Sequence, residues 1–270
     1  MNIQSSPPRI VSRTEWLSAR QAHLVHEKEF TRQRDKLAAE RRQLPWVKIE
    51  KPYVFETLDG KKSLPELFAG RSQLIVYHFM FGPGWEEGCK SCSFGMDHMD
   101  PMLPHLAARD ITFIAASRAS LPEIEEFRGR MGWKFQWVSA GDNGFNSDFH
   151  VSFSREDMEA GKVNYNFQAC PPGLMPVEEL PGISVFARNA NGEVFHTYSA
   201  YARGCEALLG TYQILDLTPK GRDEENLVHS MSWVRHHDRY HENYTLDTRA
   251  GYEPPRGSMF HPFGRGENVR

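Results

Sequence analysis

The stretch LIVYHFMFGPGWEEGCKSCSFGM, residues 74–96, decides the fold. It opens with an apolar run from Leu74 to Phe81 that only His78 interrupts. A run of this length, rich in β-branched and aromatic residues, is typical of a strand buried on both faces. Gly-Pro-Gly at residues 82–84 ends the run, and Cys89 and Cys92 follow at C-x-x-C spacing.

The order of strand, turn, C-x-x-C pair and helix is the arrangement of a thioredoxin-like redox site. The spacing predicts Cys89 at a helix N-terminus, where unpaired N–H groups and the helix dipole favour a thiolate. Lys90 acts in the same direction, whereas Glu86 and Glu87 oppose it if they point inward. We expect the helix terminus to prevail and the pKa of Cys89 to lie somewhat below the usual value of about 8.5. Cys92, nearly one turn further along, is expected to be the buried resolving thiol, and Cys89 the exposed nucleophile.

Two other interpretations of the cysteine pair stay open. Cys89 and Cys92 can be ordinary cysteines near a turn, or two ligands of a metal ion. A structural zinc site needs four ligands, usually with a second close pair. The remaining candidate ligands do not form such a pair; they are His98, His105, Cys170 and Cys205.

Peroxidase chemistry of the peroxiredoxin type needs a proline and a threonine at fixed positions before the reactive cysteine. Pro83 is one residue too close to Cys89, and Glu86 stands in the place of the threonine. The sequence therefore disfavours that activity without excluding it.

Composition limits the partners. The 270 residues are 40% hydrophobic and 25% charged, which is ordinary for a soluble globular protein. The net charge of −3 predicts neither a nucleic-acid nor a membrane partner. We find no signal-peptide segment and no window of membrane-spanning length, so a cytoplasmic location is expected. Four cysteines in such a chain do not indicate a disulfide framework.

Segments after the motif alternate between strand and helix. Residues 111–116 and 135–138 have the pattern of buried strands, and residues 121–131 that of an amphipathic helix with Pro122 in its first turn. This alternation predicts parallel strands in an α/β sheet. The expected organisation is a helical arm over 1–45, a thioredoxin-like domain over 46–220, and a C-terminal helix with an extended tail over 221–270.

The arm is expected to be one helix over residues 14–43, capped by Thr14 and ended by Pro45. Its apolar stripe is thin: Leu17, Leu24, Val25, Phe30 and Leu37. Such a helix either docks on the outside of the domain or pairs with a second copy of the chain. A homodimer is therefore possible.

Residues 139–180 form a long insertion of Gly, Asn, Asp and aromatic residues. The aromatic content argues against disorder. It predicts an ordered wall beside the thiols that turns an open site into a pocket; packing away from the thiols is the alternative. The aromatic residues are Phe145, Phe149, Phe153, Tyr165 and Phe167.

Pro181 follows the insertion and precedes the predicted strand 183–186. In thioredoxin-like folds a cis-proline precedes the strand that faces the thiols and offers backbone hydrogen bonds to a peptide. Gly182 intervenes here, so an ordinary trans bond before Pro181 is equally open. Together with Trp85, in the turn before the motif, Pro181 and Gly182 are the expected substrate-binding residues.

The C-terminal region contains a histidine-rich segment, WVRHHDRYH, on a predicted helix over residues 226–240. His237 and His241 share one face at i, i+4, a spacing that can bind a metal, although a solvated or interface helix is favoured. His196 and Tyr198, on a hairpin around residues 189–192, can approach the thiols or be ordinary sheet residues.

Five segments together resemble one bacterial family strongly: residues 16–49, 70–83, 88–94 (GCKSCSF), 130–139 (RMGWKFQWVS) and 196–204 (HTYSAYARG). The family is catalogued as domain of unknown function 899 and described as predicted dithiol-disulfide isomerases with a thioredoxin-like fold. The resemblance extends from about Arg9 to Tyr240, and Cys89 and Cys92 fall on the family's motif. It implies the fold and, more weakly, thiol–disulfide chemistry.

These patterns predict an α/β protein with a thioredoxin-like core that acts as a thiol–disulfide oxidoreductase on a small or dedicated substrate. Cys89 attacks a substrate disulfide and Cys92 resolves the mixed disulfide. No cofactor is expected, because neither a dinucleotide-binding glycine motif nor a P-loop is present, and no metal is assigned. The alternatives are a non-redox binding protein on the same scaffold and a metal-binding protein that uses Cys89, Cys92 and histidines.

Overall fold

The computed structural model describes residues 8–171, 177–241 and 244–259. They divide into two compact units, one ending at Pro45 and one beginning at Trp46. The first unit contains a single helix, α1 (Arg13–Arg41). Ser12 caps it in place of Thr14, because its side chain accepts the Glu15 N–H while the Glu15 carboxylate accepts the Ser12 N–H.

The helix α1 buries none of its residues, and the predicted apolar stripe is exposed along its length. Phe30 and Leu37 are 69% and 59% exposed. Docking on the outside of the domain and pairing with a second copy of the chain both stay predictions.

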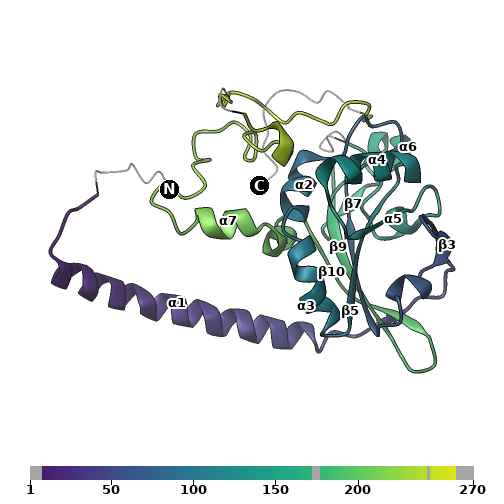
Figure 1. The fold of residues 1–270 in the computed structure, drawn as a ribbon, viewed down its shortest axis with the longest axis horizontal. Helices are drawn as coiled ribbons and strands as arrows, with labels where there is room; N and C mark the ends of the chain where they lie inside the picture. Colours follow the sequence, from purple (N-terminus) through teal and green to yellow (C-terminus); the bar gives the residue numbers. More distant parts are fainter. Residues whose placement is uncertain (1–7, 172–176, 242–243, 260–270) are drawn as a thin grey trace. The chain divides into compact units, whose positions relative to one another are not determined.

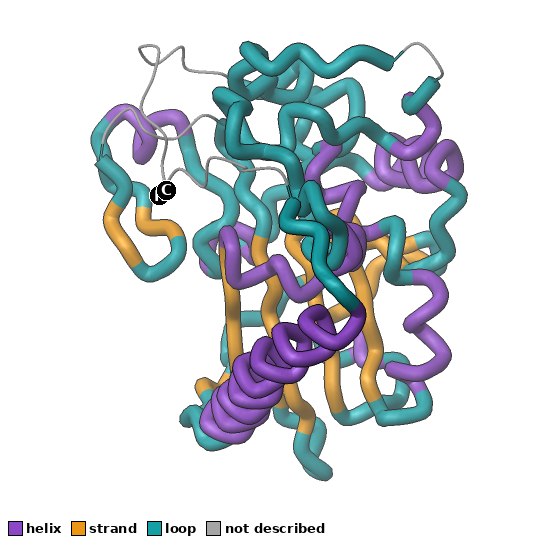
Figure 2. The backbone as a smooth tube through the Cα atoms, turned by 90° about the vertical axis from the view of Figure 1, so that its left-hand side faces the viewer, coloured by secondary structure: helices purple, strands orange, loops and turns teal. Residues whose placement is uncertain are grey.

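The second unit is built on an eight-stranded sheet with the strand order β1-β10-β9-β4-β5-β6-β2-β3 (Figures 1 and 2). The strands are β1 (Val47–Lys48), β2 (Val54–Thr57), β3 (Gly60–Ser63), β4 (Gln73–His78), β5 (Ile111–Ser117), β6 (Gln136–Ser139), β9 (Gly182–Arg188) and β10 (Val194–Tyr201).

Four central strands give the fold its class. Strand β4 leads through helix α2 (Lys90–Met96) to β5, which pairs with β4 in parallel, Val76 opposite Ile114. Strand β9 is antiparallel to β4 and β10 is antiparallel to β9. A parallel βαβ unit followed by an antiparallel hairpin, with C-x-x-C at the first helix, is the thioredoxin-like arrangement. The predicted fold is confirmed.

Helices cover both faces of this sheet. One face packs against α2, α3 (Leu103–Ala107) and α4 (Leu121–Met131), and its core contains both motif cysteines. The other face packs against the short helices η1 (Glu66–Phe68) and α5 (Phe145–Asp148). Successive side chains of β4 alternate between the two faces, so Tyr77 lies on the thiol face and His78 on the opposite one.

The insertion contains more structure than the sequence predicted. It forms helices α5 and α6 (Arg155–Glu159) and a small hairpin of β7 (Asn164–Tyr165) and β8 (Gln168–Ala169). Phe145 and Phe149 are buried on the face opposite the thiols, which contradicts their expected place beside the C-x-x-C. The reason is the stacking partner His78, which faces them from β4.

The predicted helix over residues 226–240 is wrong. This region forms turns and one short 3-10 helix, η4 (His237–Arg239), after η3 (Ala202–Leu208) and α7 (Gly210–Leu215). Its side chains bond to the C-x-x-C loop and to α2, so tertiary contacts override the local helical pattern. Within the described ranges, no helix has both the length and the apolar composition needed to cross a bilayer. A further short 3-10 helix, η2 (Asp100–Met102), connects α2 to α3.

A buried polar network lies on the face opposite the thiols. The His78 Nδ1 contacts Asn146 Oδ1 at 3.0 Å, and its Nε2 contacts Ser184 Oγ at 2.9 Å. Ser184 continues through Ser199 to His196 Nε2 at 2.8 Å. Burial lowers the pKa of His78 to about 4, so the ring is neutral at physiological pH.

This neutral histidine predicts acid sensitivity. As pH falls below about 6.5, the unfolded chain takes up a proton on His78 that the folded chain refuses until about pH 4. Stability therefore falls over that window, in total by about 3 kcal/mol for this group. Urea unfolding of wild type and His78→Gln between pH 7 and 4 should show a shallower slope in the variant. His23→Gln, on exposed α1, is the control; equal slopes in wild type and His78→Gln would contradict the assignment.

Candidate functional site

The two motif cysteines follow the carboxyl end of β4: Cys89 ends the loop that leads to helix α2, and Cys92 lies in the first turn of that helix. The loop stays bonded to the sheet, because Phe79 N–H donates to Ala116 O at 2.9 Å and Ala119 N–H donates to Phe81 O at 2.9 Å. Cys89 N–H then donates to Met80 O at 3.0 Å, which fixes the start of the helix. The backbone of the apolar run thus positions the nucleophile.

Cys89 is the N-cap residue of α2, as the spacing predicted. The Cys92 thiol donates to the Cys89 sulfur and lowers the pKa of Cys89, and the N–H groups of Ser91 and Cys92 and the Lys90 charge act in the same direction. Burial opposes them, and the pKa settles at about 7. Helix-terminus N–H groups therefore favour the thiolate, as expected.

Cys92 lies deeper, and burial raises its pKa well above the usual value, while a hydrogen bond from Tyr77 acts in the opposite direction. Both thiols are free. The two residues are 6% and 2% exposed, so the expected exposure of Cys89 is wrong although the order of accessibility is right. The Cys89 sulfur thus lies at a helix N-terminus that favours the thiolate, but the residue is buried.

Two acidic residues, Glu86 and Glu87, precede the motif. The sequence left open whether they oppose the thiolate, and in the structure they do not. Glu87 accepts from Arg130 at 2.9 Å and from Arg239 at 2.7 Å. Glu86 is 65% exposed and lies 3.7 Å from Arg256. Arginines thus engage both carboxylates, and water screens the outer one.

The histidine-rich segment supports the thiol loop, a role that the sequence did not reveal. Buried His236 donates from Nε2 to the Gly88 carbonyl at 2.8 Å, directly before Cys89. His237 Nδ1 lies 2.7 Å from Asp97 Oδ1, directly after α2. The only available signal was the unusual density of histidine and arginine in WVRHHDRYH.

Trp85, expected to bind substrate, is buried at 2% exposure in the same core as the thiols. Its Nε1 donates to Glu178 Oε1 at 2.7 Å, and Glu178 Oε2 accepts the Met259 N–H at 2.9 Å. Glu178 is itself buried. Trp85 therefore ties the thiol loop to the end of the insertion and to the C-terminal segment.

The other two expected substrate-binding residues lie at the start of β9. The described residues contain no cis peptide bond, so the bond before Pro181 is trans. The Pro181 carbonyl accepts the Tyr165 hydroxyl at 2.7 Å, which occupies an acceptor that a peptide would otherwise use. Gly182 pairs with His78, and a Cβ there would lie 2.9 Å from Tyr201 and Val151.

Two further candidate residues, His196 and Cys205, lie outside the dithiol pair. His196 belongs to the network on the opposite face of the sheet, as does its neighbour Phe149. Cys205 is buried, and burial raises its pKa to about 12. Throughout the described ranges, no group of three or more His, Cys, Asp or Glu side chains is arranged to hold a metal ion.

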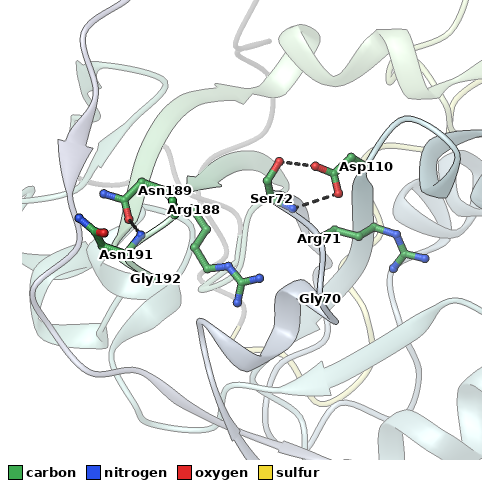
Figure 3. A pocket seen from close by; sticks show the side chains of 9 residues that line it. Gly70, Arg71, Ser72, Asp110, Arg188, Asn189, Asn191 and Gly192 are labelled. Atoms are coloured by element: carbon green, nitrogen blue, oxygen red, sulfur yellow. Dashed lines mark hydrogen bonds between the residues drawn. The ribbon is translucent and has the colours of Figure 1, made fainter.

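A polar cavity of about 560 Å³ lies at the other end of the sheet, where β4 begins and the β9–β10 hairpin turns (Figure 3). Arg71 and Arg188 line it together with Asp110, which accepts from the Ser72 backbone at 3.2 Å. Since Cys89 follows the opposite end of β4, this cavity is separate from the dithiol site.

The family model for a bacterial protein of unknown function, DUF899, matches residues 5–240. The chain belongs to this family. Membership in DUF899 covers the whole thioredoxin-like core and the dithiol motif, but the family's description assigns no reaction. No curated protein sequence matches this DUF899 chain significantly.

Solved peroxiredoxin structures are distantly similar to this DUF899 chain. Peroxiredoxin Q of Xanthomonas campestris, structure F4, has a TM-score of 0.41 and 15% identity over 64% of this chain and 98% of its own. Peroxidoxin BcpB of Mycobacterium tuberculosis has a TM-score of 0.40 and 10% identity over 64% and 97%. At these values the comparison has no bearing on the reaction, and the fold assignment rests on the strand order.

Proposed function

We propose that this protein is a thiol–disulfide oxidoreductase whose reacting pair is Cys89 and Cys92. The observation that carries the proposal is the position of Cys89 as the N-cap residue of α2, with Cys92 in the first turn of the same helix. A thiolate is the nucleophile of disulfide exchange, and a pKa near ambient pH favours the attack.

The proposed reaction has two steps. The Cys89 thiolate attacks one sulfur of a substrate disulfide, the substrate S–S bond breaks, and one substrate thiolate leaves and takes a proton. Cys92 then loses its proton and attacks the Cys89 sulfur, which releases the second substrate thiol and forms the Cys89–Cys92 disulfide. Two electrons pass from the protein dithiol to the substrate disulfide, and a small thiol or dithiol reductant restores the pair.

The residues around the pair suggest how the second step is assisted. The Tyr77 hydroxyl bonds to Cys92 and stabilises its thiolate, although burial raises the Cys92 pKa overall. The first attack therefore falls to Cys89, and Cys92 reacts once the mixed disulfide holds a sulfur beside it. This division of roles is the one the spacing predicted.

We propose a small or dedicated disulfide as the substrate, because Cys89 is covered and the Pro181 carbonyl is occupied by Tyr165. Tyr252 of the C-terminal segment packs against the thiol core, and the end of the insertion contributes Val177 and Leu180 to it.

Mixed-disulfide trapping tests the proposal. Cys92→Ser, incubated with cystine, oxidised glutathione or insulin, should accumulate a covalent adduct on Cys89 that dithiothreitol releases, and the small disulfides should react faster than insulin. The double variant Cys89→Ser with Cys92→Ser is the control and should form none. Absence of any adduct on Cys89, at every disulfide and at pH 8, would reject the oxidoreductase function.

A further inference from the structure

The C-terminal segment Gly251–Met259, called the strap below, lies along the loop that contains Cys89. In Figure 1 this yellow-green part of the chain passes beside the start of α2. Its Tyr252 packs against the core cluster that contains both motif cysteines. Burial raises the pKa of Tyr252, and the two thiols lie near enough for their charges to act on it.

The strap is attached to the thiol loop at several points. Its Arg256 carbonyl accepts the Glu86 N–H at 3.0 Å. Its Glu253 carboxylate lies 3.3 Å from the Nζ of Lys90, the first residue of α2. At the far end, Met259 N–H donates to buried Glu178 at 2.9 Å. The strap therefore follows the loop from Glu86 to Lys90.

The approach of the two backbones is close. Gly257 has a φ of +84°, and a Cβ at that position would lie 2.1 Å from the Gly84 carbonyl oxygen. Real Cβ atoms do not come so near, and an L residue is also strained at this φ. Glycine at 257 is thus required for the strap to seat on the turn before the motif.

Several of the interactions that attach the strap are nevertheless weak. Residues 251–259 form turns and coil without helix or strand. The Glu253 and Arg256 side chains are 68% and 85% exposed, and ion pairs of such exposure contribute little. Buried partners are reached by Tyr252, by the Met259 amide and by Gly257, which lies against the backbone of Gly84 and Trp85. A segment with few buried contacts opens at low free energy, without unfolding of the core.

Disulfide exchange requires that a substrate sulfur reach Cys89, and the closed strap prevents this approach. The three sulfurs of the transition state lie nearly in line, so a substrate sulfur must reach Cys89 with its leaving group pointing outward. At 6% exposure Cys89 has no room for that approach. The thiolate is activated but shielded.

We propose that the strap is a lid over Cys89, held by Tyr252 and by the seating of Gly257 on the Gly84 turn, and that its opening controls access of disulfides to the thiol. The proposal rests on the function proposed above in taking Cys89 as the reacting thiol. Opening exposes the C-x-x-C loop for a partner, and closure protects the thiolate from non-specific oxidation and exchange.

Alkylation kinetics test the lid. Iodoacetamide labelling of reduced protein at pH 8.5, where Cys89 is mostly ionised, should be about ten-fold faster or more in Gly257→Ala and in Tyr252→Ala than in wild type. Peptide mass mapping assigns the label to Cys89. Gly251→Ala is the matched control, because a Cβ there meets nothing within 4 Å, and it should label at the wild-type rate.

Hydrogen exchange separates lid opening from general destabilisation. The Glu86 amide, which donates to Arg256, should exchange faster in Gly257→Ala, while the Ile114 amide in the central strand β5 should not. Wild-type labelling within two-fold of Gly257→Ala would overturn the lid.

Turnover on cystine keeps the two proposals apart. Faster labelling without turnover in any variant would reject the oxidoreductase function and leave the lid. Turnover on cystine, together with equal labelling rates in wild type and both lid variants, would reject the lid and leave the oxidoreductase function.

Discussion

Replacement of Cys89 by serine is expected to lower disulfide-exchange turnover at least about 10³-fold, because a hydroxyl is a far weaker nucleophile than a thiolate. Cys92→Ser should also stop turnover, but it should retain the first attack and react once with each disulfide. The two variants thus separate nucleophile from resolving thiol. Turnover of cystine with dithiothreitol as reductant measures the loss, with the cysteine formed separated by chromatography and the rate without protein subtracted.

Cys170→Ser is the matched control, since Cys170 lies in the insertion and keeps a partly exposed position outside the dithiol core. Its turnover should equal that of wild type. If Cys89→Ser retained the wild-type rate, or if Cys170→Ser lost it, the assignment of Cys89 as nucleophile would fail. A reversed order, with first attack retained in Cys89→Ser and lost in Cys92→Ser, would exchange the two roles.

Trp85→Ala is expected to destabilise the fold by about 3–5 kcal/mol, the usual cost of truncating a buried tryptophan. Trp85 is 2% exposed, and its loss also leaves the Glu178 carboxylate without the Nε1 donor. Trp85→Phe keeps an aromatic ring but removes the donor, so about 1–3 kcal/mol is expected from the buried Glu178 oxygen that loses its hydrogen bond. Urea unfolding followed by far-UV circular dichroism measures both.

Trp46→Ala is the control for tryptophan loss as such. Trp46 is 56% exposed, so its replacement should cost no more than about 1 kcal/mol. The sequence predicted that Trp85 binds substrate, and the same variants examine that role. A stable Trp85→Ala protein, within about 1 kcal/mol of wild type, whose KM for cystine rises strongly would support substrate contact and contradict the core role.

The segment from Leu74 to Met96 determined the main features locally. A short apolar run rich in β-branched and aromatic residues is typical of a buried strand, and a C-x-x-C pair directly after the turn places the first cysteine at a helix N-terminus. Alternation of strand and helix then forced parallel pairing of β4, β5 and β6. Each of these inferences depends on neighbours within about one turn or one strand, which is the range over which sequence patterns act.

Only the tertiary structure decided what surrounds the thiols. Phe145 and Phe149 have the composition of a pocket wall, but stacking on His78 places them on the other face of the sheet. The region 226–240 has a helical pattern, but His236 and His237 bond to residues more than a hundred positions earlier. Such bonds join groups that are distant along the chain, so no local period encodes them.

Cys89 shows most clearly which properties follow from local sequence and which follow from tertiary contacts. Its position at the end of α2 and the resulting low pKa follow from three neighbouring residues, Lys90, Ser91 and Cys92. Its burial arises in a core to which distant segments contribute, among them Tyr252, more than 150 residues further along the chain. The sequence by itself determined how reactive the sulfur is, because that depends on bonds within one helical turn. The tertiary structure alone decided whether a substrate can reach it, because a cover over the site forms only when distant segments pack together.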